Sequence, residues 1–196
     1  MAIRSLSLIA LSLVLASCNQ TLPSILTVIG MSLPASKAVI EIEDNSDADI
    51  TIEATGKQWQ WGYQYLKGEG EGIAFQSAPV LNEQKISASA IPGLSRSDNY
   101  LIDVDNPVVV PFKKKIRLVL TADDVIHAWS VPALGMTQDA IPGFLRETSF
   151  RTDTIGTYRG QCAELCGKNH AFMPIVIKVV NGEEYKQWVD SKLRKK

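Results

Sequence analysis

Short stretches of alternating apolar and polar residues fill the chain from residue 38 onward. This period of two is typical of β-strands with one buried face. The predicted strands are residues 50–54, 58–65, 100–104, 108–110, 115–120, 126–131, 148–150, 157–161 and 175–180. Turn-forming Gly, Pro, Asn and Asp separate many of them. Many short strands at this spacing favour a mostly β fold, either a sandwich or a barrel.

Two segments depart from the alternation. Residues 183–193 carry aromatic and aliphatic side chains at helical spacing after a break at Gly182. They predict a short C-terminal helix packed on the barrel. Residues 76–98 are poor in aromatic side chains and rich in small and polar ones, so we expect a long loop.

The N-terminal part begins like a secretory signal. Arg4 precedes an apolar run, residues 6–16, and small residues follow. Cys18 ends a stretch that resembles a bacterial lipoprotein cleavage box, in which this cysteine would be lipidated. The other interpretation is that Cys18 is an ordinary apolar residue in an uncleaved anchor. We therefore expect residues 1–20 to form a signal or lipoprotein-like leader.

A second apolar run, residues 22–33, follows the leader. It is too short to cross a bilayer alone, which takes about 20 residues, although joined to the first run it could form one interrupted span. We expect residues 21–37 to be a remnant of a transmembrane helix and residues 38–196 to be a globular domain held at the outer side of a membrane.

Composition and charge narrow the function classes. A chain of 196 residues can hold one well-buried domain and an appendage. Its 45% hydrophobic and 21% charged residues fit a globular protein with some membrane-facing sequence. The net charge is −1, whereas nucleic-acid binders usually concentrate basic residues on one face. We expect no nucleic-acid partner.

Sulfur and nitrogen donors gather near the end of the chain. Cys162, Cys166, His170 and Met173 lie within twelve residues, and His127 is the one other histidine of the chain. Thiolates, imidazoles and a thioether, without a run of carboxylates, are the ligands that copper prefers. Flanking glycines and a proline indicate a tight loop around a metal. One copper would need one thiolate, whereas this set, with the intervening Glu164, suffices for two coppers bridged by both sulfurs.

Other interpretations of the two cysteines fit less well. Zinc usually takes four strong ligands and does not take a thioether. Haem attachment and thioredoxin-like chemistry need two residues between the cysteines, whereas three intervene here. A plain disulfide between Cys162 and Cys166 is the simplest alternative in an oxidising compartment. It would leave the two histidines and Met173 without a role.

Several stretches together resemble cytochrome c oxidase subunit II. They are VIHAWSVP at residues 125–132, DAIPG at residues 139–143, the loop 162–173 and GKQWQWGYQY at residues 56–65. The interval of 35 residues from His127 to Cys162 also matches that family. The resemblance runs from about residue 21 to the C-terminus. It implies a cupredoxin-like Greek-key β-barrel that carries a mixed-valence dinuclear copper centre, CuA.

The resemblance also implies the copper ligands, by motif position. Cys162 and Cys166 would bridge the two copper ions, and His127 and His170 would each ligate one of them. Met173 and a backbone carbonyl, that of Glu164, would complete the two coordination spheres.

Further roles are implied for residues around the centre. The Glu164 side chain would contribute to a magnesium site at the interface with subunit I. Trp59 matches the residue through which electrons arrive from cytochrome c; the alternative is that Trp59 and Trp61 share one strand face and mainly pack. Asp105 and Asp124 match acidic positions of the family's docking face for cytochrome c.

The function implied is the electron-accepting subunit of a respiratory cytochrome c oxidase, an oxidoreductase whose oxygen chemistry lies in subunit I. Electrons would pass from cytochrome c through CuA to the haem of subunit I, which reduces oxygen to water. The implied partners are cytochrome c, subunit I, other oxidase subunits and the membrane, and the implied location is the periplasmic side of a bacterial plasma membrane.

One feature departs from the family pattern. Members usually carry two transmembrane helices before the barrel, and this chain resembles only the latter part of the second. The alternative function is therefore a stand-alone, membrane-tethered periplasmic copper electron-transfer protein. The CuA domain of a nitrous-oxide reductase fits less well because the aromatic strand and the surroundings of Glu164 match the oxidase family better.

Overall fold

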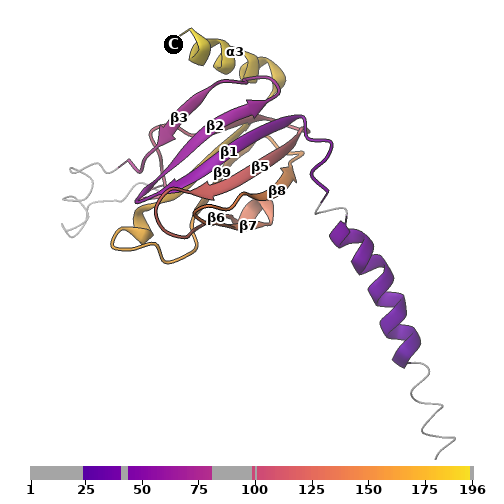
Figure 1. Cartoon of the computed structure of the whole chain (residues 1–196). Coiled ribbons are helices and arrows are strands. Elements are labelled where there is room, and N and C mark those ends of the chain that lie inside the picture. Colours follow the sequence, from indigo (N-terminus) through magenta and orange to yellow (C-terminus); the bar gives the residue numbers. More distant parts are fainter. Residues whose placement is uncertain (1–23, 41–43, 81–98, 100, 195–196) are drawn as a thin grey trace, which may run out of the picture. The chain divides into compact units, whose positions relative to one another are not determined.

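The computed structural model describes residues 24–40, 44–80, 99 and 101–194 (Figure 1). The chain divides into two units, Met1–Asp44 and Asn45–Lys196, and each is described by itself. In the first unit, residues 24–40 form a helix whose side chains are all exposed. Within the described residues, no helix combines the length and apolar character needed to cross a membrane. The leader predicted for residues 1–20 lies outside the described residues.

Two five-stranded sheets make up the second unit. The first has the strand order β3-β2-β1-β5-β8 and the second has the order β4-β10-β9-β6-β7. The first contains β1 (Ile50–Lys57), β2 (Gln60–Lys67), β3 (Ala74–Ser77), β5 (Lys115–Ala122) and β8 (Arg146–Arg151). The second contains β4 (Val108–Pro111), β6 (His127–Val131), β7 (Met136–Ala140), β9 (Gly156–Cys162) and β10 (Pro174–Val180).

The chain crosses between the sheets several times. β1 pairs in parallel with β5 and β10 in parallel with β4, while the other pairs are antiparallel. Consecutive strands β4, β5 and β6 alternate between the second, first and second sheets. Such crossings are typical of Greek-key sandwiches and barrels. The prediction of a mostly β, cupredoxin-like fold is confirmed.

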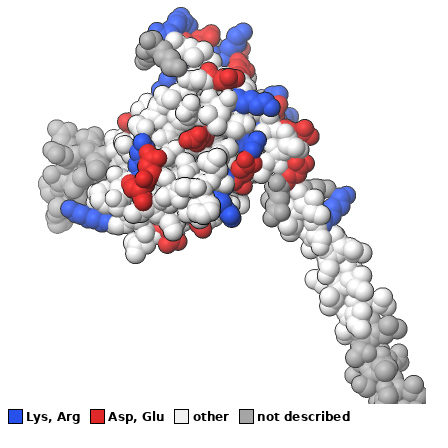
Figure 2. Space-filling view, in the orientation of Figure 1, with Lys and Arg blue, Asp and Glu red and all other residues white. Residues whose placement is uncertain are grey.

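The core lies between the two sheets because alternate residues of each strand point inward. Its buried side chains include Ile52 and Ala54 of β1, Leu118 and Leu120 of β5, and Ile175 and Ile177 of β10. Burial of each large aliphatic side chain stabilises the fold by about 1.5–3 kcal/mol relative to exposure. On the face shown in Figure 2, basic and acidic side chains lie side by side on the globular unit, and surface ion pairs such as Lys57–Asp123 occur.

Some predicted elements were wrong. Residues 101–102 lie in a turn or bend and Val104 forms only an isolated bridge with Pro79, so residues 101–104 of the predicted strand 100–104 are not a strand, and residue 100 lies outside the described part. The pattern missed β3 and β7, which are edge strands. One of the four residues of β3 and two of the five residues of β7 are buried, so the apolar alternation of both strands is weak. The predicted loop from residue 76 is also wrong at its start, because residues 76 and 77 belong to β3; residues 81–98 lie outside the described part.

The C-terminal helix α3 (Gly182–Leu193) forms as predicted, with a different start. Asn181 is its N-cap and accepts a hydrogen bond from the backbone N–H of Glu184 at 2.9 Å. Gly182 is therefore the first helical residue, and Asn181 provides the start signal. Tyr185 is buried and Trp188 packs against Tyr65 of β2, with ring centroids 5.4 Å apart. These contacts close one edge of the core.

Candidate metal centre

His127 is the first residue of β6 and is fully buried. The edge of the Trp61 ring meets its imidazole, with centroids 5.9 Å apart. On the other side, a Cβ at Gly56 would lie 2.7 Å from His127 Cδ2. Since real Cβ atoms do not approach that closely, the imidazole fits only because position 56 has no side chain.

The two thiols lie together beside this imidazole. Cys162 ends β9, where it pairs with Trp129 of β6 and its N–H donates to the Met173 carbonyl at 3.0 Å. Cys166 lies in the following loop and is also buried. Both cysteines are free, and their Sγ atoms are 3.8 Å apart.

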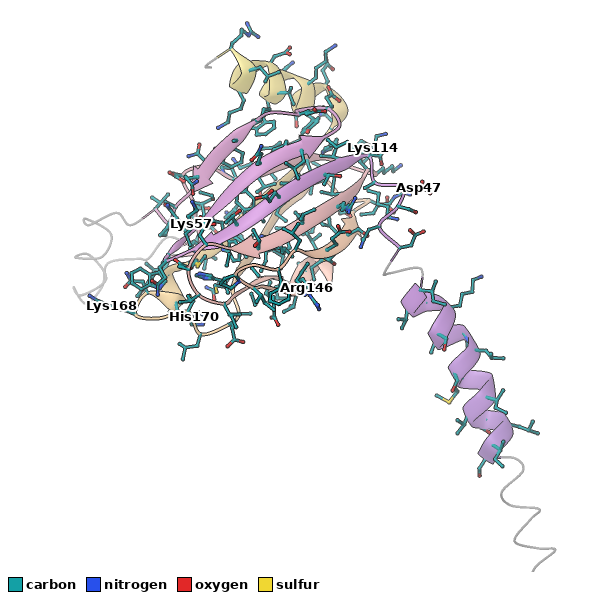
Figure 3. The ribbon with its side chains drawn as sticks, viewed as in Figure 1. Asp47, Lys57, Lys114, Arg146, Lys168 and His170 are labelled. Atoms are coloured by element: carbon teal, nitrogen blue, oxygen red, sulfur yellow. The ribbon has the colours of Figure 1, made fainter. Side chains whose placement is uncertain are left out.

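Each thiol faces a different imidazole. Cys162 Sγ lies 3.9 Å from His127 Nδ1, and Cys166 Sγ lies 3.6 Å from His170 Nδ1. Donor atoms of His127, Cys162 and Cys166 lie within 4.8 Å of one another, and among the described residues these three form a group able to hold a metal ion. His170 is half-buried, in the short 3-10 helix His170–Phe172, and Figure 3 shows it at the same end of the domain as Lys57 and Lys168.

Met173 and Glu164 lie at the same loop in different ways. Met173 is fully buried and belongs to the same core cluster as the two cysteines. The Glu164 backbone carbonyl accepts a hydrogen bond from the Cys162 thiol at 3.3 Å, while residue 164 itself is exposed. Sequence analysis therefore named six residues that the fold brings to one loop and its neighbouring strand.

The electrostatics of the two thiols differ. Burial tends to raise the pKa of Cys162, but hydrogen bonds to His127 and to backbone groups outweigh it and lower that pKa to about 6. Burial and the negative charge of Cys162 raise the pKa of Cys166 to about 12. Burial tends to lower the pKa of His127, yet Cys162 and Asp124 raise it overall. The first proton to leave the dithiol therefore comes from Cys162.

Asp124 contacts the imidazole from the side opposite the thiol. Its Oδ1 lies 2.9 Å from His127 Nε2, and its Oδ2 accepts the backbone N–H of Gln58 at 2.7 Å. Burial tends to raise the pKa of Asp124, but the hydrogen bonds from His127, Val125 and Gln58 hold it below its usual value. The ionised carboxylate can only accept, so the proton of this hydrogen bond is on Nε2, and the imidazole is oriented with Nδ1 toward Cys162.

Trp59 lies in the turn between β1 and β2, not on a strand. Its Nε1–H donates to the Cys166 carbonyl at 3.3 Å, and a Cβ at Gly167 would lie 3.3 Å from its Cζ2. Trp61, by contrast, is fully buried in the core. The interpretation that both indoles share one strand face is therefore wrong, because the turn separates their environments.

Sequence analysis missed three contributors to the site: Gly56, Gln58 and the orienting role of Asp124. Gly56 and Gln58 lay inside a stretch noted for its aromatic residues. Asp124 was named only as an acidic position on a docking face. The position of Asp124 three residues before His127 was the one signal available, and it does not reveal a contact with position 58.

The donor set fits copper. Two thiols, two imidazoles with Nδ1 directed at sulfur, and a buried thioether are soft donors. Both cysteines are buried, and the group includes no buried carboxylate of the kind that Mg²⁺ or Ca²⁺ prefers. An imidazole oriented by a carboxylate is a common arrangement around bound metals.

Comparisons with known proteins agree with this chemistry. Residues 50–180 match the family described as cytochrome C oxidase subunit II, periplasmic domain. The chain is 40% identical over 176 residues to cytochrome c oxidase subunit 2 of Cyanidium caldarium, covering 88% of this chain and 66% of that relative. It is 40% identical over 171 residues to the probable cytochrome c oxidase subunit 2 of Rickettsia bellii (strain RML369-C), covering 87% and 59%.

A solved structure is similar as well. It is the periplasmic domain of subunit II of the cytochrome oxidase of Bradyrhizobium japonicum, with a TM-score of 0.65 and 44% sequence identity. The match covers 76% of this chain and 96% of that one. The chain spans slightly less than two thirds of the length of the Cyanidium and Rickettsia relatives.

Proposed function

The chain belongs to the cytochrome c oxidase subunit II family, and we propose that it is the electron-accepting subunit of a respiratory cytochrome c oxidase. Its relatives carry the name of a subunit of that oxidoreductase. We propose that the site holds two copper ions as a CuA centre. The ligands would be His127, Cys162, the Glu164 carbonyl, Cys166, His170 and Met173.

The observation that carries this proposal is the pairing of donors. Two thiols lie 3.8 Å apart, and each has its own imidazole Nδ1 within 4 Å. A mononuclear thiolate site needs one sulfur, whereas two adjacent sulfurs with one imidazole each suit two ions that share both thiolates. When bound, such a centre takes up and releases single electrons with little change in geometry.

The protein's own residues would prepare that centre. Cys162 supplies a thiolate at neutral pH because its pKa is lowered to about 6. Asp124 would orient the His127 ring, with Nδ1 toward Cys162, by accepting a hydrogen bond from Nε2–H. The packed core on the His127 side excludes water, which keeps these interactions strong.

Trp59 would be the point where electrons arrive from cytochrome c. Its indole is half-buried, packs on Gly167 and donates a hydrogen bond to the Cys166 carbonyl. A delocalised ring at this position lies between solvent and a candidate ligand residue. The donor protein would dock over this turn, with its haem edge near the indole.

The side of the loop 162–173 away from Trp59 would contact subunit I. His127 pairs with Ala140, and residues 122 and 142 form a bridge, so the loops before β6 and after β7 lie together. Exposed apolar side chains on these loops and the cysteine loop are Val125, Ile126, Phe144, Leu145, Leu165 and Phe172. Several exposed large apolar residues near one site indicate a protein interface.

The same side of the loop would carry two further roles. The half-buried His170 would be the contact through which electrons leave toward the haem of subunit I. The exposed Glu164 side chain would supply an oxygen ligand for magnesium at that interface, since carboxylate oxygen is a preferred magnesium ligand.

We further propose that the domain lies on the periplasmic side of a bacterial plasma membrane. The matching family model describes a periplasmic domain, and one relative is bacterial. The apolar helix at residues 24–40 would hold the chain near the membrane, together with other oxidase subunits.

Three measurements test the function. Metal analysis of the full chain is expected to give two copper ions per chain. The spectrum of the oxidised protein is expected to show one electron shared between the two ions. A single copper, or stoichiometric zinc, would refute the bridged-thiolate site. Purification from the native membrane is expected to yield the chain with a haem-bearing subunit I. Recovery only as a free, membrane-tethered copper protein would instead support the stand-alone alternative.

A further inference from the structure

Asp124 receives hydrogen bonds from a residue three positions away and from a distant segment of the chain. One is His127, whose Nε2 lies 2.9 Å from Oδ1, and the other is the backbone N–H of Gln58, 2.7 Å from Oδ2. Positions 58 and 124 are 66 residues apart. A single carboxylate thus ties the strand that carries a candidate ligand to the β1–β2 turn.

Gln58 extends this connection to the other side of the site. Its side-chain Nε2 donates to the Cys166 carbonyl at 2.9 Å, while its backbone N–H is bonded to Asp124. The indole of Trp59 donates to the same carbonyl at 3.3 Å. Hydrogen bonds therefore run from His127 through Asp124 and Gln58 to Cys166.

This bridge matters most for Cys166, because Cys166 is not part of a strand. Cys162 is fixed by the pairing of β9 with β6 and β10. The loop after it returns to the sheet at residues 163 and 174, through the bond from Ala163 N–H to the Ala128 carbonyl and through the start of β10. Between those points, the carbonyl of Cys166 is bonded to the β1–β2 turn.

We propose that Gln58 and Asp124 are positioning residues that set the spacing between His127 and Cys166. This inference rests on the proposed dinuclear copper centre and gives both residues a role that acts through the ligands of that centre. The bridge joins a ligand on a rigid strand to a ligand on a loop, so that the loop keeps its place when a partner docks on it. Removal of a residue that hydrogen-bonds to a metal ligand typically lowers metal affinity by about 10-fold to 100-fold.

Gln58 and its neighbour Trp59 have different proposed roles. Trp59 is the candidate for electron uptake, whereas Gln58 contributes only hydrogen bonds, one from its backbone and one from its amide. Loss of the amide should therefore alter copper binding and the surroundings of His127. It should do so although residue 58 touches neither imidazole.

The experiment compares copper release from the full chain to a strong chelator. The variants are Gln58→Ala, Asp124→Ala and the double variant. We expect release to accelerate about 10-fold in Gln58→Ala and between about 10-fold and 100-fold in Asp124→Ala. Because both residues belong to one bridge, the double variant should release copper at a rate close to that of Asp124→Ala. Its acceleration should be well below the product of the two single accelerations.

Matched controls exist on the same elements. Gln64→Ala removes an exposed amide from β2, and Asp123→Ala removes the neighbouring carboxylate, which pairs with Lys57 at the surface. Both controls should release copper within about twofold of the wild type, as surface substitutions usually have small effects. If Asp124→Ala does not fold, Asp124→Asn replaces it; it keeps one acceptor oxygen and should give a smaller acceleration.

A second readout uses the metal-free protein and is independent of copper loading. The His127 Nε2–H proton should give a downfield NMR signal protected from exchange. That signal should disappear in Asp124→Ala, shift in Gln58→Ala and stay unchanged in Gln64→Ala. If the wild type fails to bind two coppers, the proposed function is wrong, but this signal still tests the bridge.

Two results would overturn the proposal. One is a Gln58→Ala variant that matches the wild type in both copper release and the His127 signal. The other is a double variant whose acceleration equals the product of the single effects, which would mean that the two residues act separately.

Discussion

The His127–Cys162 pair and the His170–Cys166 pair contain the same two side chains in different surroundings. His127 and Cys162 lie on paired strands, are buried and contact Trp61, Asp124 and Trp129. His170 and Cys166 lie on a loop. The imidazole of this second pair is half-buried, and the cysteine carbonyl is bonded to the β1–β2 turn.

This difference separates two requirements of the proposed electron-transfer site. The strand-borne pair is fixed by the fold itself, so its geometry does not depend on a partner. In the loop-borne pair the thiol is buried and the imidazole is partly exposed, where the proposed electron exchange with another protein would take place. The site therefore combines a rigid half with an accessible half, and Gln58 and Asp124 lie where the two halves join.

The largest effect is expected when one of the two thiols that join the halves is removed. Cys162→Ser or Cys166→Ser should each abolish the dinuclear centre, because an alcohol does not replace a bridging thiolate for copper. Copper analysis and the spectrum of the oxidised protein measure the loss. Far-ultraviolet circular dichroism checks that the fold is retained. A serine variant that keeps two coppers would show that one sulfur suffices.

The next test compares the two histidines in the metal-free protein. His127→Ala should lower the free energy of unfolding by about 2–4 kcal/mol, because it leaves a cavity beside Trp61 and removes one of the hydrogen-bond donors to Asp124. His170→Ala should cost about 0.5 kcal/mol or less, as half-exposed loop positions do. Urea denaturation of both variants provides the comparison. Equal losses would mean that the loop pair is as firmly held as the strand pair.

A smaller effect is expected at the accessible half. Trp59→Ala should slow electron uptake from cytochrome c by about 10-fold, equivalent to ~1.4 kcal/mol in barrier height, while the copper content stays at the wild-type value. Stopped-flow mixing with reduced cytochrome c measures the rate. Trp188→Ala, which removes an indole at α3, is the matched control and should leave that rate unchanged.

The smallest effects concern the pH dependence of the metal-free protein. Thiolate absorbance in the ultraviolet should show one thiol ionising near pH 6, at Cys162, and the other only near pH 12, at Cys166. The ordinary pKa of a thiol is about 8.5. Stabilisation from Cys162 is therefore present above about pH 8.5 and is lost as pH falls through 6.

The stabilisation from Cys166 depends on pH with the opposite sign. Its pKa of about 12 lies above the ordinary value, so its stabilisation is present below about pH 8.5 and is lost as pH rises toward 12. Cys162→Ser should remove the first ionisation and also ease the second, since the charge of Cys162 would no longer oppose it. Two identical ionisations would remove the electrostatic distinction between the halves.

Much of the fold could be predicted from the residue pattern. The central strands β1, β5, β6 and β10 were predictable because each buries most of its apolar side chains, on both faces in β6 and in most of β10. The strands β3 and β7 escaped prediction because few of their side chains are buried. The helix start was misplaced by one residue because a capping role depends on a hydrogen bond, not on composition.

The sequence by itself determined the donors and their likeness to one family. His127, Cys162, Cys166, His170 and Met173 are recognisable because metals select side chains by chemistry, and chemistry is written in residue type and spacing. Only the tertiary structure decided which imidazole faces which thiol, which imidazole is fully buried, and that Asp124 and Gln58 connect the two pairs. Those features depend on contacts between positions 66 and 108 residues apart, and such contacts arise only when the sheets and loops have folded together.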